Sequence, residues 1–156
     1  MMIYLSSACL IGLCTRYDGR TNTDEYVLNL FREGKVIPVC PEQLGGLPTP
    51  REPVEFKGGD AEAVLQGKAR LIGLDTGKDW TDHFIRGAIE VMKLVKILNL
   101  EAAFLMDRSP SCGSARVHVD GKVVEGMGVT AYLLKKSGIK LIVRAPEGSD
   151  CQETSL

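Results

Sequence analysis

The sequence lacks any apolar run long enough to cross a lipid bilayer, which takes about 20 consecutive apolar residues. No basic segment precedes the short apolar run at the N-terminus, so a secretory signal is not indicated. An excess of one charge is also missing, because 19 Lys and Arg face 20 Asp and Glu, and the formal net charge is -1. Such a chain has no field to concentrate phosphate backbones. We expect a cytoplasmic protein that binds neither membranes nor nucleic acid polymers.

Several catalytic and metal-binding signatures are absent as well. The chain has no P-loop and no G-x-S-x-G motif, and it has neither the close C-x2-C pairs of zinc sites nor the C-x2-C-x2-C run of ferredoxins. It has two histidines, His83 and His118, and we expect both at the surface. The sequence GMGVTA at 126–131 has the form of a dinucleotide loop, but too few residues follow it, so we interpret it as structural.

The chain does have enough apolar material for one core. Its 156 residues suit one domain, and 44% apolar with 25% charged residues is typical of a soluble globular protein. We expect a single domain over residues 1–145 and a flexible C-terminal tail over 146–156. Five cysteines are an odd number, and in a reducing compartment we expect ligands, nucleophiles or buried thiols rather than bridges.

Apolar runs alternate with helical patterns along the chain, which predicts an α/β fold. The strands are predicted at 2–6, 35–40, 69–74, 101–106 and 139–144. The helices are predicted at 23–34, 80–100 and 128–138. This order favours a mostly parallel, mixed β-sheet flanked by helices, Rossmann-like, with right-handed crossovers.

Three local predictions complete the expected fold. The alternating segment 117–124 turns at Asp120 and Gly121 and predicts a small β-hairpin. Residues 41–60 contain four prolines and four glycines, which indicates a largely irregular loop. The helix at 80–100 places a row of apolar residues on one face. These are Phe84, Ala88, Met92, Val95 and Leu98.

Three cysteines each follow a predicted strand: Cys9, Cys40 and Cys112. Carboxyl ends of parallel strands share one edge of the sheet, and ligands bind there. A single free cysteine is usually a small buried residue, but three at one edge favour a metal or cluster site. Glycine or proline near each one lets the backbone approach a bulky group closely. Cys14 is an alternative ligand or a buried thiol, and we expect Cys151 to be incidental.

The softness of thiolates suits an iron-sulfur cluster. Three protein ligands on a four-iron cluster leave one iron open to bind a substrate as a Lewis acid. Glu42 lies two residues beyond Cys40, so its carboxylate is a candidate general acid or base, with a solvated loop residue as the alternative. Arg51 is expected to pair with Glu52 or Glu55 rather than bind an anion.

The sequence also resembles a known family. The resemblance covers most of the chain and is carried by SACLIGLCTRYDG, PVCPEQLGGLPTPREPVE, FIRGA, SPSCGS and GMGVTAYLLKKSGI. These motifs are similar to those of the family catalogued as domain of unknown function 523 (DUF523), which includes thiouracil desulfurases. The resemblance implies a [4Fe-4S] enzyme that converts thiouracil, or a related thiopyrimidine or thioamide, to the oxo compound and sulfide without net redox change.

The same resemblance implies roles for individual residues. Cys9, Cys40 and Cys112 would be the cluster ligands, Glu42 would handle proton transfers, and Ser109 would assist through a hydrogen bond. From the residues alone, Ser109 and its neighbour Ser111 could equally cap local backbone groups.

Two other functions stay open on the residues alone. An iron-sulfur or metal-binding sulfur carrier would use the same cysteines without needing Glu42. A thiol redox protein would use two of the cysteines in a reversible disulfide and no iron. The expected partner is a small thio-substrate, and the sequence does not set the oligomeric state.

Overall fold

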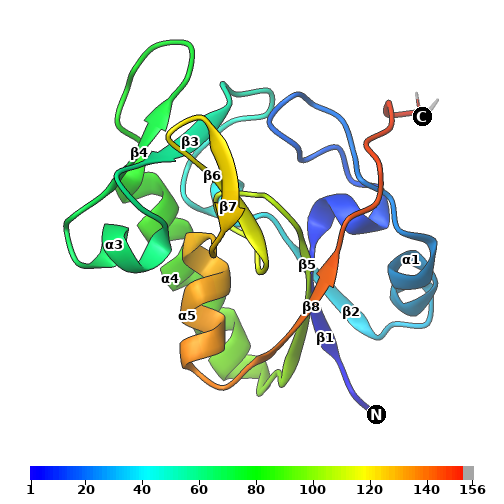
Figure 1. Cartoon of the computed structure of the whole chain (residues 1–156). Coiled ribbons are helices and arrows are strands. Elements are labelled where there is room, and N and C mark those ends of the chain that lie inside the picture. The colour runs from blue at the N-terminus through cyan, green and yellow to red at the C-terminus, as the bar shows by residue number, and fades with distance from the viewer. Residues whose placement is uncertain (153–156) are drawn as a thin grey trace.

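The computed structural model describes residues 1–152 and contains two four-stranded sheets with helices around them (Figure 1). The strands are β1 (Tyr4–Ser7), β2 (Val36–Val39), β3 (Val54–Lys57), β4 (Arg70–Gly73), β5 (Ala102–Met106), β6 (Arg116–Val119), β7 (Lys122–Glu125) and β8 (Lys140–Arg144). The helices are the 3-10 helix η1 (Ala8–Ile11), α1 (Glu25–Arg32), α2 (Pro41–Leu44), α3 (Ala61–Leu65), α4 (Thr81–Leu98) and α5 (Val129–Lys136). In the part of the chain described, no helix is long and apolar enough to span a membrane.

The first sheet has the strand order β2-β1-β5-β8, and all of its strands are parallel. Helices cover both faces of its central strand β5, whose side chains are apolar on both sides. On one face, Ala103 and Leu105 pack with Val91 and Val95 of α4. On the other face, Phe104 packs with residues of η1 and α1. Figure 1 shows α1 on one side of this sheet and α4 with α5 on the other. The predicted fold class is confirmed.

The second sheet has the order β4-β3-β6-β7 and is mixed. The predicted hairpin is confirmed, with Asp120 and Gly121 at positive φ between β6 and β7. We expected a single sheet, and the structure has two. The prediction of an irregular loop over residues 41–60 is wrong in part, because α2 and β3 lie within it. Proline is tolerated in the first turn of a helix, and four residues free of glycine and proline are enough for a short strand.

The long helix α4 is confirmed, but its buried face is not the predicted one. Phe84, Ala88 and Val95 are buried as expected. Leu98 is exposed, and Val91 takes the central buried position in place of the half-buried Met92. The buried face therefore shifts around the helix, because α4 packs against both sheets and must cover the first sheet with Val91 and Val95 and the second with Phe84 and Ala88.

The described part of the predicted tail lies against the loop that follows η1. Asn22 Nδ2 donates to the Pro146 carbonyl at 2.9 Å, and Thr21 pairs with Ser149 in an isolated bridge. Cys14 and Cys151 form a disulfide with Cα atoms 6.1 Å apart. The expectations that Cys151 is incidental and that the cysteines form no bridges are therefore wrong. Residues 153–156 of the predicted tail lie outside the described residues.

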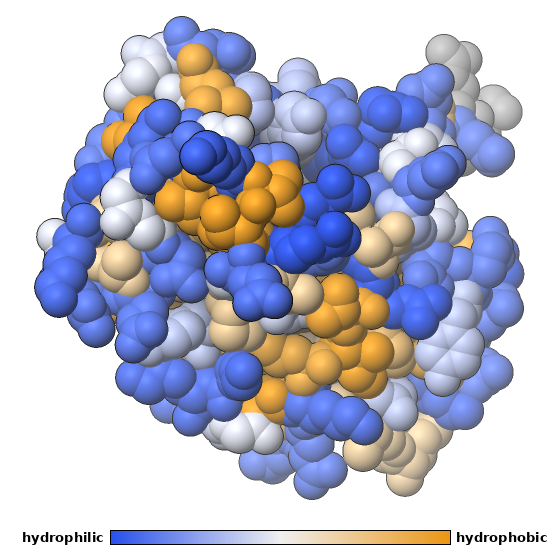
Figure 2. All heavy atoms as spheres, viewed as in Figure 1, coloured by the Kyte–Doolittle hydropathy of each residue, from blue (hydrophilic) through white to orange (hydrophobic). Residues whose placement is uncertain are grey.

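Apolar side chains gather on one face of the molecule over β7 and β8 (Figure 2). Val123 of β7 and Val143 of β8 are both exposed. Strand β8 is an edge of the first sheet, and its ends carry Lys140 and Arg144. Charged residues at the ends of an edge strand disfavour pairing with a strand of another chain.

Candidate active site

The three unpaired cysteines follow three parallel strands and line one cavity of about 640 Å³. Cys9 lies in η1 after β1, Cys40 follows β2 directly, and Cys112 lies in the loop after β5. Helix η1 ends at Gly12, whose φ of 92° is in the left-handed region that favours glycine. The structure thus brings the cysteines to the sheet edge at which the strand order predicted them.

Burial controls the ionisation of these thiols. Cys9 and Cys112 are buried, and Cys40 is half-buried. Loss of solvent, together with the fields of Cys112 and Cys40, raises the pKa of Cys9 to about 12 against a smaller opposing effect of Arg16. Burial likewise raises the pKa of Cys112 to about 12, and it raises the pKa of Cys40. With pKa values raised in this way, the three thiols are protonated at neutral pH. Binding of a metal ion or cluster would displace those protons.

Helix α2 places Glu42 beside the cysteines. Cys40 is its N-cap residue and Pro41 its first residue, so Glu42 lies in the first turn. This short helix lies directly on α4, and a glycine on each side permits the contact. A Cβ atom at Gly45 would collide with the carbonyl oxygen of His83, and a Cβ atom at Gly87 with that of Pro41. Backbone contact between the two helices therefore fixes the position of Glu42.

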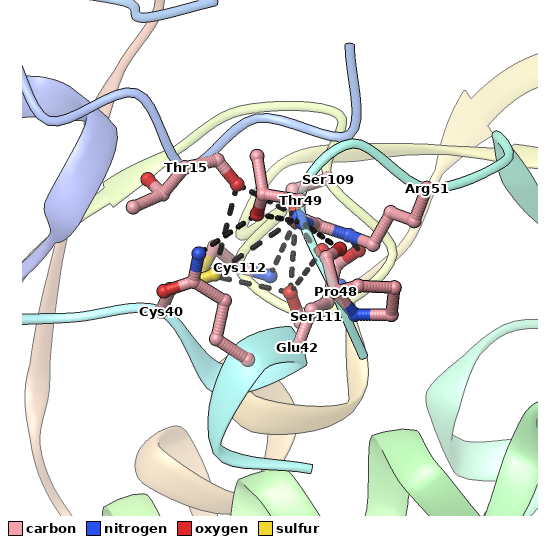
Figure 3. Close-up of polar contacts among 10 residues, drawn as sticks. Thr15, Cys40, Glu42, Pro48, Thr49, Arg51, Ser109, Ser111 and Cys112 are labelled. Carbon is pink, nitrogen blue, oxygen red and sulfur yellow. Dashed lines mark hydrogen bonds and ion pairs between the residues drawn. The ribbon is translucent and has the colours of Figure 1, made fainter. Parts of the chain in front are cut away.

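The carboxylate of Glu42 is held at both oxygens (Figure 3). Arg51 Nε donates to Oε1 at 3.0 Å, and Ser111 Oγ donates to Oε2 at 2.9 Å. The Glu42 side chain is 12% exposed and the Arg51 side chain 6% exposed. Glu42 is therefore an oriented carboxylate in the wall of the cavity and not a solvated loop residue.

The serines of SPSCG have different partners. Ser109 Oγ accepts the backbone N–H of Ser111 at 3.2 Å and of Cys112 at 3.0 Å, so it caps the loop as serines beside proline often do. The hydroxyls of Ser109 and Ser111 lie 3.1 Å apart. Ser111 is buried and reaches Glu42 directly, with its Oγ 3.9 Å from Cys112 Sγ. Sequence reasoning predicts only a capping role for Ser111, and its position next to Cys112 is the one signal in the sequence that points to the site.

Arg51 pairs with Glu42, so the expected pairing with Glu52 or Glu55 is wrong. The carboxylates of these two acids instead accept hydrogen bonds from neighbouring turns. Glu52 accepts hydrogen bonds from the turn after β4, including the backbone N–H of Thr76 at 3.0 Å. Glu55 accepts the backbone N–H of Gly121 at 3.2 Å in the turn of the hairpin. Proximity in sequence therefore did not identify the partner of Arg51. Glu52 and Glu55 are bound by donors that lie closer to them in space than Arg51 does.

The 2-thiouracil desulfurase family model matches residues 4–145. The chain belongs to this family. Protein YbbK of Bacillus subtilis strain 168, described as uncharacterized, is 41% identical over 141 residues, which are 88% of this chain and 93% of that protein. The solved structure of a [4Fe-4S]-dependent thiouracil desulfidase, TudS (DUF523), matches with a TM-score of 0.79 at 34% identity, covering 92% of this chain and 91% of that one. The resemblance drawn from the motifs is confirmed.

The donor set at the cavity, three thiols, has the soft chemistry that an iron-sulfur cluster takes. Within residues 1–152, no three His, Cys, Asp or Glu side chains converge closely enough to hold one metal ion. An iron-sulfur cluster, in contrast, offers a separate iron to each thiolate, so its ligands lie around the group rather than at one point. Three unpaired thiols from three different segments line one cavity, which is compatible with that requirement.

The remaining motifs support the site without adding chemistry to it. Gly128 of GMGVTA packs against the SPSCG loop, where a Cβ atom would collide with the carbonyl of Ser111. Val129 N and Ala131 N, at the start of α5, both donate to carbonyls of that loop at 3.0 Å. The structural interpretation of GMGVTA is confirmed. His118 is exposed as expected, whereas His83 is half-buried with its ring 5.0 Å from that of Trp80.

Proposed function

We propose that this protein is a [4Fe-4S]-dependent desulfurase that hydrolyses 2-thiouracil, or a related thiopyrimidine or thioamide, to the oxo compound and hydrogen sulfide. The observation that carries the proposal is the oriented carboxylate of Glu42 in the same cavity as three unpaired thiols. A sulfur carrier needs the thiols but no positioned base. Membership of the 2-thiouracil desulfurase family and the structural match to TudS support the substrate class.

Cys9, Cys40 and Cys112 would hold the cluster. When bound, it would supply a Lewis acid for the thiocarbonyl sulfur through the iron that no cysteine ligates. The reaction consumes one water, whose oxygen stays on the ring carbon while the C–S bond breaks and sulfur leaves as hydrogen sulfide. No electrons are gained or lost.

Glu42 is the proton carrier in this scheme. A carboxylate has about four acceptor positions, so hydrogen bonds from Arg51 and Ser111 leave others free for a water molecule. Glu42 takes a proton from the attacking water and returns it to the leaving sulfur. Ser111 holds Oε2 in place, and Ser109, 3.1 Å from the Ser111 hydroxyl, orders the same loop. Action in the cytoplasm and the lack of nucleic acid or membrane partners stay predictions.

Anaerobic reconstitution tests this proposal. The protein should become brown and bind about four irons and four labile sulfides per chain. It should then release sulfide from 2-thiouracil over many turnovers. Glu42→Gln should keep the iron and lose sulfide release, since an amide cannot accept the proton. Colourless, iron-free protein after reconstitution would contradict the cluster, and release of sulfide by the Gln variant at the wild-type rate would favour a role without Glu42.

A further inference from the structure

Arg51 contacts both the carboxylate of Glu42 and the thiol of Cys40. Its Nε donates to Glu42 Oε1 at 3.0 Å, and its Nη2 lies 4.0 Å from Cys40 Sγ (Figure 3). With its side chain only 6% exposed, the guanidinium is an enclosed positive charge between a carboxylate and a thiol. Such a charge offsets the repulsion that a carboxylate and three thiolates would exert on each other in one buried space.

The other donors of Arg51 hold loops. Nη1 donates to the Pro48 carbonyl and to Thr49 Oγ1, and Nη2 donates to the Thr15 carbonyl at 2.8 Å. The backbone N–H of Arg51 donates to the Tyr17 carbonyl. The loop contacts therefore use Nη1 and Nη2, and the Glu42 contact uses Nε. Substitution of a loop partner can remove a loop contact and leave the contact with Glu42.

We propose, resting on the proposed function, that Arg51 is a positioning residue for desulfuration. It fixes the Glu42 carboxylate in one orientation toward the cavity and places a permanent positive charge next to Cys40. The planar guanidinium suits this task because its rigid fork reaches Glu42, Cys40 and the loop carbonyls at once, which the single ammonium of lysine cannot do. Misplacement of a catalytic group by about 1 Å costs up to about 100-fold in rate.

The test compares Arg51→Ala, Arg51→Lys and, as a matched control, Thr49→Val. The control removes the two hydrogen bonds that Thr49 Oγ1 accepts, from Arg51 Nη1 at 2.9 Å and from Gln43 Nε2 at 2.7 Å, and it leaves the contact between Arg51 and Glu42. The measurements are iron content, thermal unfolding of the iron-free protein, kcat per bound cluster, KM for 2-thiouracil and the reduction potential of the cluster.

For Arg51→Ala we expect kcat per cluster to fall about 100-fold with KM within about threefold of wild type. Ethylguanidine in the assay should restore part of that kcat, because it can occupy the vacated position. The reduction potential should shift to a lower value when the charge beside Cys40 is lost. Thr49→Val should show neither change. Should Arg51→Ala not fold, Arg51→Lys carries the test, with kcat per cluster lowered about tenfold.

Three results would overturn the positioning role: wild-type kcat per cluster in the foldable Arg51 variant, a loss confined to KM, or an equal loss in Thr49→Val. The result is separable from the proposed function itself. If wild-type protein releases no sulfide, the proposed function fails. If wild type is active and the Arg51 variant is equally active, the inference about Arg51 alone fails.

Discussion

The Ser111 hydroxyl donates to Glu42 Oε2 at 2.9 Å across 69 residues of sequence. Ser111 follows β5, and Glu42 follows β2, on the two sides of β1 in the first sheet. The contact joins the loop that carries Cys112 to the helix that Cys40 begins. One buried hydroxyl therefore couples the position of the proposed base to that of two proposed ligands.

Replacing Ser111 with Ala should lower kcat for sulfide release about tenfold and leave the iron content unchanged, because the base loses the donor at one oxygen while Arg51 still holds the other. Ser114 provides the control. It lies in the same loop, and its hydroxyl is buried without a hydrogen-bond partner, so Ser114→Ala should behave like wild type. Steady-state sulfide release separates the two variants, and equal activity of both would remove Ser111 from the site.

Cys9→Ala, Cys40→Ala and Cys112→Ala should each lose most of the iron bound after anaerobic reconstitution, since each removes one of three thiolates. Cys14→Ser should keep it, because Cys14 is bonded to Cys151 and does not line the cavity with the three unpaired thiols. Thiol titration of unfolded, metal-free protein gives an independent check. It should find three thiols before reduction and five after it, in agreement with one disulfide. Iron loss in Cys14→Ser would assign Cys14 to the cluster.

Gly87→Ala should weaken both stability and catalysis. The added methyl group would meet the Pro41 carbonyl, so α2 must move together with Glu42. We expect the free energy of unfolding to fall by about 1–3 kcal/mol and kcat to fall about tenfold. Urea unfolding and sulfide release measure these effects. Ile97→Ala, at an exposed position of the same helix, should change neither. A fully active Gly87→Ala protein would show that α2 can shift without consequence.

Because of Asp24, the free energy of unfolding should fall as the pH becomes acidic. Burial alone would raise the pKa of Asp24, but hydrogen bonds from the Arg144 guanidinium and from two backbone N–H groups of α1 outweigh it, so the pKa lies below its ordinary value. A lowered folded-state pKa means that the stabilisation is present above the unfolded pKa of about 4 and is lost as pH falls further through the folded pKa.

The Asp24→Asn variant isolates that charge, since Asn caps a helix about as well as Asp. At pH 7 it should be less stable than wild type by about 1–2 kcal/mol, and the difference should shrink below about pH 4. Asp150→Asn is the control, because its partner Arg20 and its own side chain are exposed, and it should matter little at any pH. A difference that persists undiminished in acid would exclude the Asp24 charge as its cause.

The order of strands and long helices could be predicted from the sequence because the signal is local. Helix α1 has an Asp cap and an apolar face within its own residues, and α4 has a helical period over its full length. Strand β3 could not be predicted in this way. It is four residues long between Pro53 and Gly58, and its strand character comes from pairing with β4 and β6.

The sequence by itself determined that three cysteines follow three strands of an α/β fold, since parallel strands end at one edge whatever the side chains around them. Only the tertiary structure decided which neighbours complete the site. Arg51 reaches Glu42 rather than the acids next to it in sequence, and Ser111 rather than Ser109 touches that carboxylate. The direction of a side chain depends on loop geometry and on competing donors from distant strands, and neither of these is a property of the local sequence.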